Sequence, residues 1–143
     1  MLNAFNGRAV QSNVANLMQR DEHRQARAIL EWLSSVNYAT QQSDCLSRRQ
    51  LGTGKWLLES IEFQKFLKEP KQTLFCQGIP GAGKTMLTSI VVDHLDTTYG
   101  NDENISLAYI YFNFRRSHEQ RMEDMLAGLL KQLVQGQSSL RIQ

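Results

Sequence analysis

Residues 78–85 of the chain, GIPGAGKT, place glycine, lysine and threonine at a spacing that suits nucleotide phosphates. They fit the Walker A pattern Gly-x-x-x-x-Gly-Lys-[Ser/Thr] at every fixed position. Gly78, Gly81 and Gly83 let the backbone turn tightly and bring its N–H groups close to a phosphate. The residue types therefore predict a phosphate-binding loop.

The side chains of this loop have separate expected roles at a bound nucleotide. Lys84 can reach the β- and γ-phosphates as a point charge, and the hydroxyl of Thr85 can bind Mg²⁺ that the nucleotide carries. A helix that begins near Lys84 directs unpaired N–H groups and its positive dipole end at the same place. The predicted binding residues are Gly78, Gly81, Ala82, Gly83, Lys84, Thr85 and Met86.

A second stretch, LGTGKW at 51–56, also contains Gly-x-Gly-Lys but lacks the other requirements of a phosphate loop. The residue five positions before Gly54 is Arg49 rather than glycine, and Trp56 after Lys55 offers no hydroxyl to a metal. We interpret this stretch as a turn ahead of a helix, in which Gly52 and Gly54 supply unusual backbone angles.

The first half of the chain is predicted to be helical. Residues 1–12 look like a loose start, and the apolar spacing that follows predicts a helix that ends near Asn37. The polar residues 38–50 indicate a connector, and residues 56–68 have helical spacing. Trp32 and Trp56 are interpreted as core anchors.

The second half is predicted to alternate strands and helices. Apolar runs at 73–77 and 105–114 are typical of strands, the first one buried with Cys76 in the core. Helices are predicted over 84–99 and from Met122 to near Gly136, with a turn at 100–104. This order predicts the α/β class: a P-loop NTPase with a parallel sheet and crossover helices, incomplete, and preceded by two helices.

Composition narrows the function classes. The chain has 143 residues and a net charge of +2, which does not predict a nucleic-acid or membrane-surface partner. It has two cysteines without metal-ligand spacing, no signal peptide and no long apolar stretch. We therefore expect an intracellular, cytoplasmic protein.

From residue 28 to about residue 140 the chain resembles the NACHT-type, nephrocystin-like N-terminal domain of fungal STAND P-loop ATPases. The stretches that carry the resemblance are ILEWLSSVNYATQQSDCLSRRQLGTGKWLLESIEFQKFL and TLFCQGIPGAGKTMLTSIVVDHL. It implies a signalling switch between ADP-bound and ATP-bound forms with Mg²⁺. The loop sequence alone does not distinguish ATP from GTP as the bound nucleotide. It also implies that Arg49, Gly52 and Thr53 lie near the adenine and ribose, with a plain structural turn as the alternative.

The resemblance further implies a division of the chain and a set of partners. Residues 1–27 would be a tail and the start of the lead-in helix, and residues 28–143 the N-terminal part of the nucleotide-binding domain. Nucleotide is the implied ligand. Self-association or C-terminal repeat domains would follow in a longer protein.

One part of the family pattern is missing from the sequence. The family has a strand that ends in an acidic pair to hold Mg²⁺, whereas the strand expected at 105–114 ends YFNF and continues RRS. We therefore expect a domain truncated before that strand. Strand edges meant for burial would be exposed, so the isolated chain is expected to be poorly soluble or molten.

Three functions stay open at this point. The first is a nucleotide-binding module of a STAND-type switch with little hydrolysis of its own. The second is a small NTPase or phosphotransferase in which Asp93 or Asp124 supplies the metal contact. The third is a fragment that binds no nucleotide and acts only through protein contacts.

Overall fold

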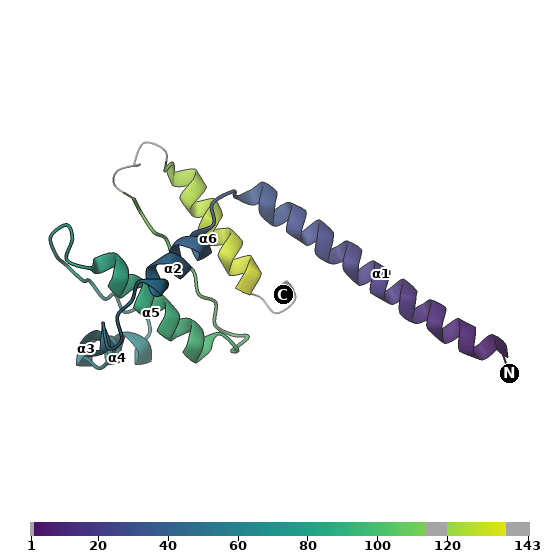
Figure 1. Cartoon of the computed structure of the whole chain (residues 1–143), viewed down its shortest axis with the longest axis horizontal. Helices are drawn as coiled ribbons and strands as arrows, with labels where there is room; N and C mark the ends of the chain where they lie inside the picture. The colour runs from purple at the N-terminus through teal and green to yellow at the C-terminus, as the bar shows by residue number, and fades with distance from the viewer. Residues whose placement is uncertain (1, 114–119, 137–143) are drawn as a thin grey trace.

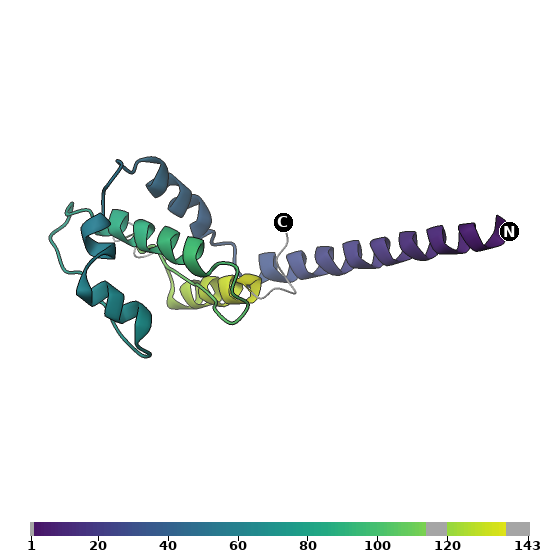
Figure 2. The same cartoon turned by 90° about the horizontal axis from the view of Figure 1, so that it is seen from below.

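The computed structural model describes residues 2–113 and 120–136, with side chains from residue 9 onward. Within these ranges the regular structure is helical: α1 Leu2–Leu33, α2 Tyr38–Ser47, α3 Lys55–Leu58, α4 Ile61–Lys68, α5 Lys84–Tyr99 and α6 Met122–Gly136. Helix α1 projects away from a body that the other helices form, as both views show (Figures 1 and 2). None of the described helices is long and apolar enough to cross a membrane.

Helix α5 is the element on which the body packs. Helix α2 lies against α5, and Ser89 and Ile90 of α5 are fully buried. The aromatic ring of Phe63 on α4 is also fully buried and lies 5.7 Å, centroid to centroid, from the ring of His94 on α5. The predicted helix over 84–99 is confirmed, and its buried face positions the glycine-rich residues that precede it.

The polar segment after α1 is helical, so the predicted connector at 38–50 is wrong over the span of α2. The Asn37 side chain accepts a hydrogen bond from the N–H of Ala39 at 2.9 Å and caps the start of this helix. Tyr38 and Gln42 are buried although most of their neighbours are polar. The apolar pattern did not predict this helix, because its buried side chains are one tyrosine and one glutamine.

The predicted helix over 56–68 is two helices. Its break is at Ser60, whose side chain accepts a hydrogen bond from the N–H of Phe63 at 3.2 Å and so begins α4. Short helix α3 ends just before, at Leu58. The final helix is confirmed, with α6 covering Met122–Gly136, and so is the turn at 100–104, where Asp102 accepts from the N–H of Ile105.

The predicted α/β class is wrong for the part of the chain that the structure describes. Residues 73–77 and 105–113 are extended, yet no backbone hydrogen bond joins these two described segments and neither forms a strand. Position 114 of the second predicted strand lies outside the described residues. Apolar and β-branched residues specify an extended backbone, but a sheet also needs a neighbouring strand to receive its hydrogen bonds.

A side chain takes the place of a strand partner for the second extended segment. The Gln132 amide on α6 accepts from the N–H of Tyr109 at 3.1 Å and donates to the carbonyl of Tyr109 at 2.9 Å. This pair fastens the segment to α6. The chain thus holds the segment by helix side chains rather than by a backbone ladder.

Several residues expected in the core lie on the surface. Phe75 is 82% exposed and Cys76 is exposed, so the segment 73–77 is not a buried strand. Trp32 and Trp56 are 84% and 65% exposed, so neither is a core anchor. These residues were expected inside because of their side-chain type, whereas their elements leave these faces without a neighbour.

Candidate phosphate-binding site

Residues 78–86, here called the glycine loop, comprise an open turn over 78–83 at the edge of the body and the first three residues of α5 (Figure 1). Gly81 and Gly83 have φ values of 85° and 84°. These lie in the left-handed region, which glycine adopts without strain. A Cβ at Gly78 would lie 3.2 Å from the Cβ of Ala82, so the turn closes tightly on itself. The predicted backbone geometry of the loop is confirmed at these glycines.

The lysine of the loop is directed back into the turn. Lys84 donates from Nζ to the carbonyl oxygens of Gly78 at 2.7 Å and Ile79 at 2.9 Å. An ammonium group has three N–H donors, so these two bonds leave one donor for a ligand. The cationic group is therefore held at the mouth of the turn, where an anion would meet the backbone of residues 78–83.

The start of α5 supplies backbone donors at the same place. Gly83 occupies the N-cap position and has no side chain to bond the first amides, while its carbonyl accepts from the N–H of Leu87 at 2.9 Å. The amides of the first turn therefore point outward without an intrahelical partner. Thr85, in this first turn, is exposed. The helix end, the lysine and the hydroxyl together make an arrangement suited to an anion with an associated cation.

The second glycine turn is a structural contact with α5. Gly52 and Gly54 have φ values of 83° and 79°, so the interpretation of residues 51–54 as a turn with unusual backbone angles is confirmed. A Cβ at Gly54 would lie only 2.8 Å from Cδ1 of Ile90, whereas one at Gly52 would meet nothing within 4 Å. The turn thus packs its second glycine against the buried face of α5.

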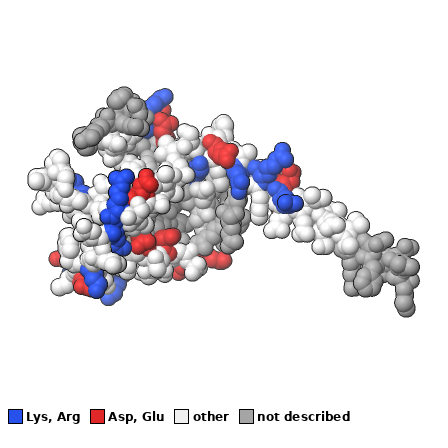
Figure 3. Space-filling model, viewed as in Figure 1, with Lys and Arg blue, Asp and Glu red and all other residues white. Residues whose placement is uncertain are grey.

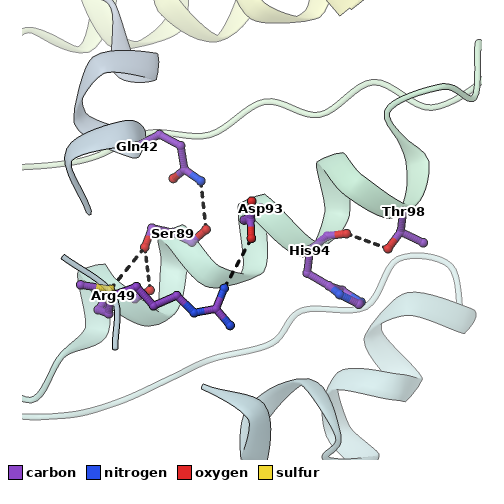
Figure 4. A network of polar contacts seen from close by, with 7 residues as sticks. Gln42, Arg49, Ser89, Asp93, His94 and Thr98 are labelled. Carbon is purple, nitrogen blue, oxygen red and sulfur yellow. Dashed lines mark hydrogen bonds and ion pairs between the residues drawn. The ribbon is translucent and has the colours of Figure 1, made fainter. Parts of the chain in front are cut away.

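Arg49 is engaged in an ion pair rather than free for a nucleotide. Its Nη1 lies 3.5 Å from Oδ2 of Asp93 on α5 (Figure 4). Asp93 is about 13 Å along the helix axis from Lys84, at 1.5 Å of rise per residue. Thr53 donates its backbone N–H to the carbonyl of Gln50 at 3.1 Å. The role of Arg49, Gly52 and Thr53 beside a base and ribose stays a prediction.

A buried polar network behind the loop was not foreseen from the sequence. Gln42 on α2 donates from Nε2 to the carbonyl of Ser89 at 2.9 Å (Figure 4). Its side-chain oxygen accepts a hydrogen bond from the hydroxyl of Tyr111. The Ser89 hydroxyl donates to the carbonyl of Met86 at 2.8 Å, one turn earlier in α5 and at the last residue of the glycine loop. Nothing in the spacing of Gln42 marks it, because a lone glutamine in a polar stretch carries no pattern.

The tyrosine in this network stays protonated over the ordinary pH range. Burial, then the charges that Cys45 and Tyr109 acquire, raise the pKa of Tyr111 to about 12. A neutral hydroxyl is the form that donates to the Gln42 amide. The network therefore keeps its donors and acceptors matched, and it fixes α2 and the segment 105–113 against the helix that begins at the loop.

The two aspartates considered as metal contacts lie away from Thr85. Asp93 is paired with Arg49, and Asp124 lines a cavity with Tyr38 and Tyr111 on the α2 side of α6. Burial and then the charge of Asp124 raise the pKa of Tyr38. No cluster of three or more metal-ligating side chains occurs among the described residues. The alternative in which Asp93 or Asp124 holds a metal for hydrolysis gains no geometric support.

Of two cavities in the described part of the body, the smaller one adjoins the glycine loop and the larger one does not. A cavity of about 660 Å³ lies between the start of α2, the end of α5 and α6. A smaller one of about 290 Å³ has Lys84 and Thr88 in its wall, beside Leu57, Leu74 and Leu87. This second cavity adjoins the loop. Its apolar wall lies beside the cationic Lys84.

A comparison with protein families matches residues 52–143 to the family described as Nephrocystin 3, N-terminal. The chain belongs to this family. The match covers more than half of the chain and includes both glycine turns, so the nephrocystin-like resemblance is confirmed. No curated protein and no solved structure matches the chain significantly.

Membership of the nephrocystin 3 N-terminal family separates the chain into a matched and an unmatched part. Helices α1 and α2 and the ion-paired Arg49 precede the matched residues, whereas α3 to α6 lie within them. The finer assignment to NACHT-type STAND proteins, and the division of the chain at residue 28, stay predictions.

Proposed function

We propose that the glycine loop binds the phosphates of a nucleotide, ATP or ADP with Mg²⁺, as the ligand-holding part of a signalling switch. The observation that carries the proposal is the convergence of the Lys84 ammonium and the first amides of α5 on one glycine turn. Both kinds of donor suit one kind of ligand. A phosphate group, with several acceptor oxygens and negative charge, is the ligand that satisfies them together.

The geometry around Lys84 supports a loop that is formed before the ligand arrives. The two carbonyl oxygens of Gly78 and Ile79 hold the ammonium in place. A ligand then does not have to order the side chain, which lowers the entropy cost of binding. The exposed hydroxyl of Thr85 would supply one ligand to Mg²⁺ carried by the nucleotide.

The proposal is tested by titrating a fluorescent ATP analogue with Mg²⁺ into the purified chain and following its anisotropy. Lys84→Ala removes the cationic donor, and we expect it to weaken binding by about tenfold or more, because a charge-assisted hydrogen bond contributes about 1.5–3 kcal/mol. Inorganic triphosphate should compete with the analogue, since the phosphates supply the recognised groups.

Lys55→Ala is the matched control, because Lys55 follows a Gly-x-Gly turn of its own in LGTGKW and lies on the short helix α3. It should leave the affinity within about twofold of the parent chain. The proposal is wrong if the parent chain does not bind the analogue, or if Lys84→Ala and Lys55→Ala bind equally well.

A further inference from the structure

Helix α1 carries a stripe of large apolar side chains without a neighbour in the described structure. Its members are 48–84% exposed: Val10, Val14, Leu17, Met18, Ile29 and Trp32. At 100° per residue they all fall within an arc of about 120°. The spacing is that of a helix surface made for another helix, because isolated surface residues would scatter around the axis.

The stripe faces away from the body to which α1 is attached. The helix contacts α6 near its C-terminal end, where Leu30 is 4% exposed. Leu30 lies about 160° around the helix from the centre of the stripe. The Nζ of Lys131 on α6 donates to the carbonyl of Ser34 at 2.8 Å and strengthens this attachment. The body therefore leaves the stripe open along its length, as the projection of α1 in Figures 1 and 2 shows.

Charges on the described part of α1 gather at the end next to the body, and residues 9–19 beyond them carry no charge, as the white stretch in Figure 3 shows. Three charged residues lie on or beside the stripe itself. Asp21 is within the arc and is hydrogen-bonded to Gln25 at 3.1 Å, whereas Arg24 and Glu22 lie about 20° beyond its two edges. Any helix that covers the centre of the stripe must place something opposite Asp21.

A second copy of α1 in the opposite direction meets this requirement. With the helices antiparallel, Asp21 of each copy lies opposite Arg24 and Gln25 of the other, and Leu17 lies opposite Ala28 and Ile29. A parallel pair in register would instead bring Asp21 against Asp21, which is unfavourable because like charges repel. The antiparallel arrangement pairs Asp21 with Arg24 while it keeps apolar residues opposite apolar residues.

The area is large enough for such a pair to be stable. At its observed exposure each large apolar side chain of the stripe presents roughly 60–120 Å², so five of them give about 400 Å² per copy. Homodimer interfaces are about 65% apolar, so the pair would bury about 1,200 Å² in total. That is the lower limit for specific, stable interfaces.

We infer that the chain self-associates through the apolar stripe of α1, as an antiparallel pair of helices with the two bodies at opposite ends. The contact lies outside the residues matched to the family and outside the glycine loop. It does not rest on the proposed nucleotide binding. Lys84→Ala should therefore leave the association unchanged.

Sedimentation velocity of the full chain over a range of concentrations tests the inference. The parent should approach twice the monomer mass, and Leu17→Glu should raise the dissociation constant about tenfold or more, because two carboxylates would be buried in each dimer. Gln19→Glu is the matched control, since Gln19 lies on the opposite side of the same helical turn and is exposed. It should change the constant by about twofold at most.

The direction of the pair is tested by exchanging its charges. Asp21→Arg alone should weaken the association, and adding Arg24→Asp in the same chain should restore it, because each arginine again meets a carboxylate. Circular dichroism checks that every variant keeps its helix content. A parent that stays monomeric at all soluble concentrations, a Leu17→Glu chain that associates normally, or Asp21→Arg without effect would overturn the inference.

Discussion

At the scale of single residues, the glycines of the two turns have different constraints although their backbone angles are alike. All four with positive φ, Gly52, Gly54, Gly81 and Gly83, adopt values near 80°. Only at Gly54 is the space for a Cβ also occupied, by the Ile90 side chain. The requirement at Gly54 is therefore both conformational and steric, whereas at the others it is conformational.

This difference predicts unequal costs for two similar substitutions. Gly54→Ala should lower the free energy of unfolding by about 1–3 kcal/mol more than Gly52→Ala, because both add the strain of positive φ but only the first compresses Ile90. Urea unfolding followed by far-ultraviolet circular dichroism measures both. Equal costs for the two variants would show that α5 shifts freely to accept the methyl group.

The residue types of the glycine loop led to the loop directly, because phosphate binding needs glycine, lysine and a hydroxyl at fixed spacing. The anchoring of that loop could not be found in the same way. Gln42, Ser89 and Tyr111 have no characteristic spacing, and their contacts join residues as far apart in sequence as α2 and the segment 105–113.

At the scale of elements, α2 is attached to α5 through a polar bond rather than through a broad apolar face. The buried Gln42 amide joins the carbonyl of Ser89 to the hydroxyl of Tyr111. No buried side-chain nitrogen or oxygen among the described residues lacks a partner. Removing one member of this chain of bonds would therefore leave another without its partner.

Gln42→Leu should destabilise the chain by about 1–3 kcal/mol, because the Tyr111 hydroxyl then stays buried without an acceptor. Adding Tyr111→Phe should recover part of that loss, since both polar groups are then gone. The measurement is a double-mutant cycle of urea unfolding, with Gln41→Leu as the control on the same helix. A double variant that is as unstable as the sum of the single ones would contradict a direct pair.

Element prediction succeeded where a repeating apolar face decides the structure and failed where partners decide it. The helices over 84–99 and Met122–Gly136 follow from their spacing. Helix α2 depends on the cap at Asn37 and on two buried side chains. The two extended segments were correctly read as extended, but whether extended backbone becomes a sheet depends on a neighbour that local sequence does not specify.

At the scale of the whole molecule, the chain exposes far more surface than a compact protein of its mass. Its accessible surface is 11757 Å², whereas a folded monomer of 16.4 kDa has about 7,500 Å². The projecting helix α1 and the exposed apolar side chains of the body both contribute to this larger surface. This excess gives a physical reason for the expectation of low solubility, which stays a prediction.

Calorimetry should detect the same excess. The heat-capacity change of unfolding is proportional to the surface that unfolding exposes, so we expect about three quarters of the value for a compact chain of this length. The thermal transition should be broad, and the chain should bind a hydrophobic dye strongly in native buffer. Lowering the concentration, which would dissociate paired α1 helices, should increase dye binding. A sharp transition with a full heat-capacity change and no dye binding would contradict this expectation.

The extended segments, which have no strand partner in the described structure, also affect the rate of amide hydrogen exchange. Between residues 106 and 113, which the structure describes, the amides of Tyr109 and Asn113 donate to glutamine side chains and the others have no such acceptor. Those remaining amides can exchange their hydrogen with water without any opening of the fold. The segment 106–113, rather than the projecting first helix, would then be where deuterium appears first.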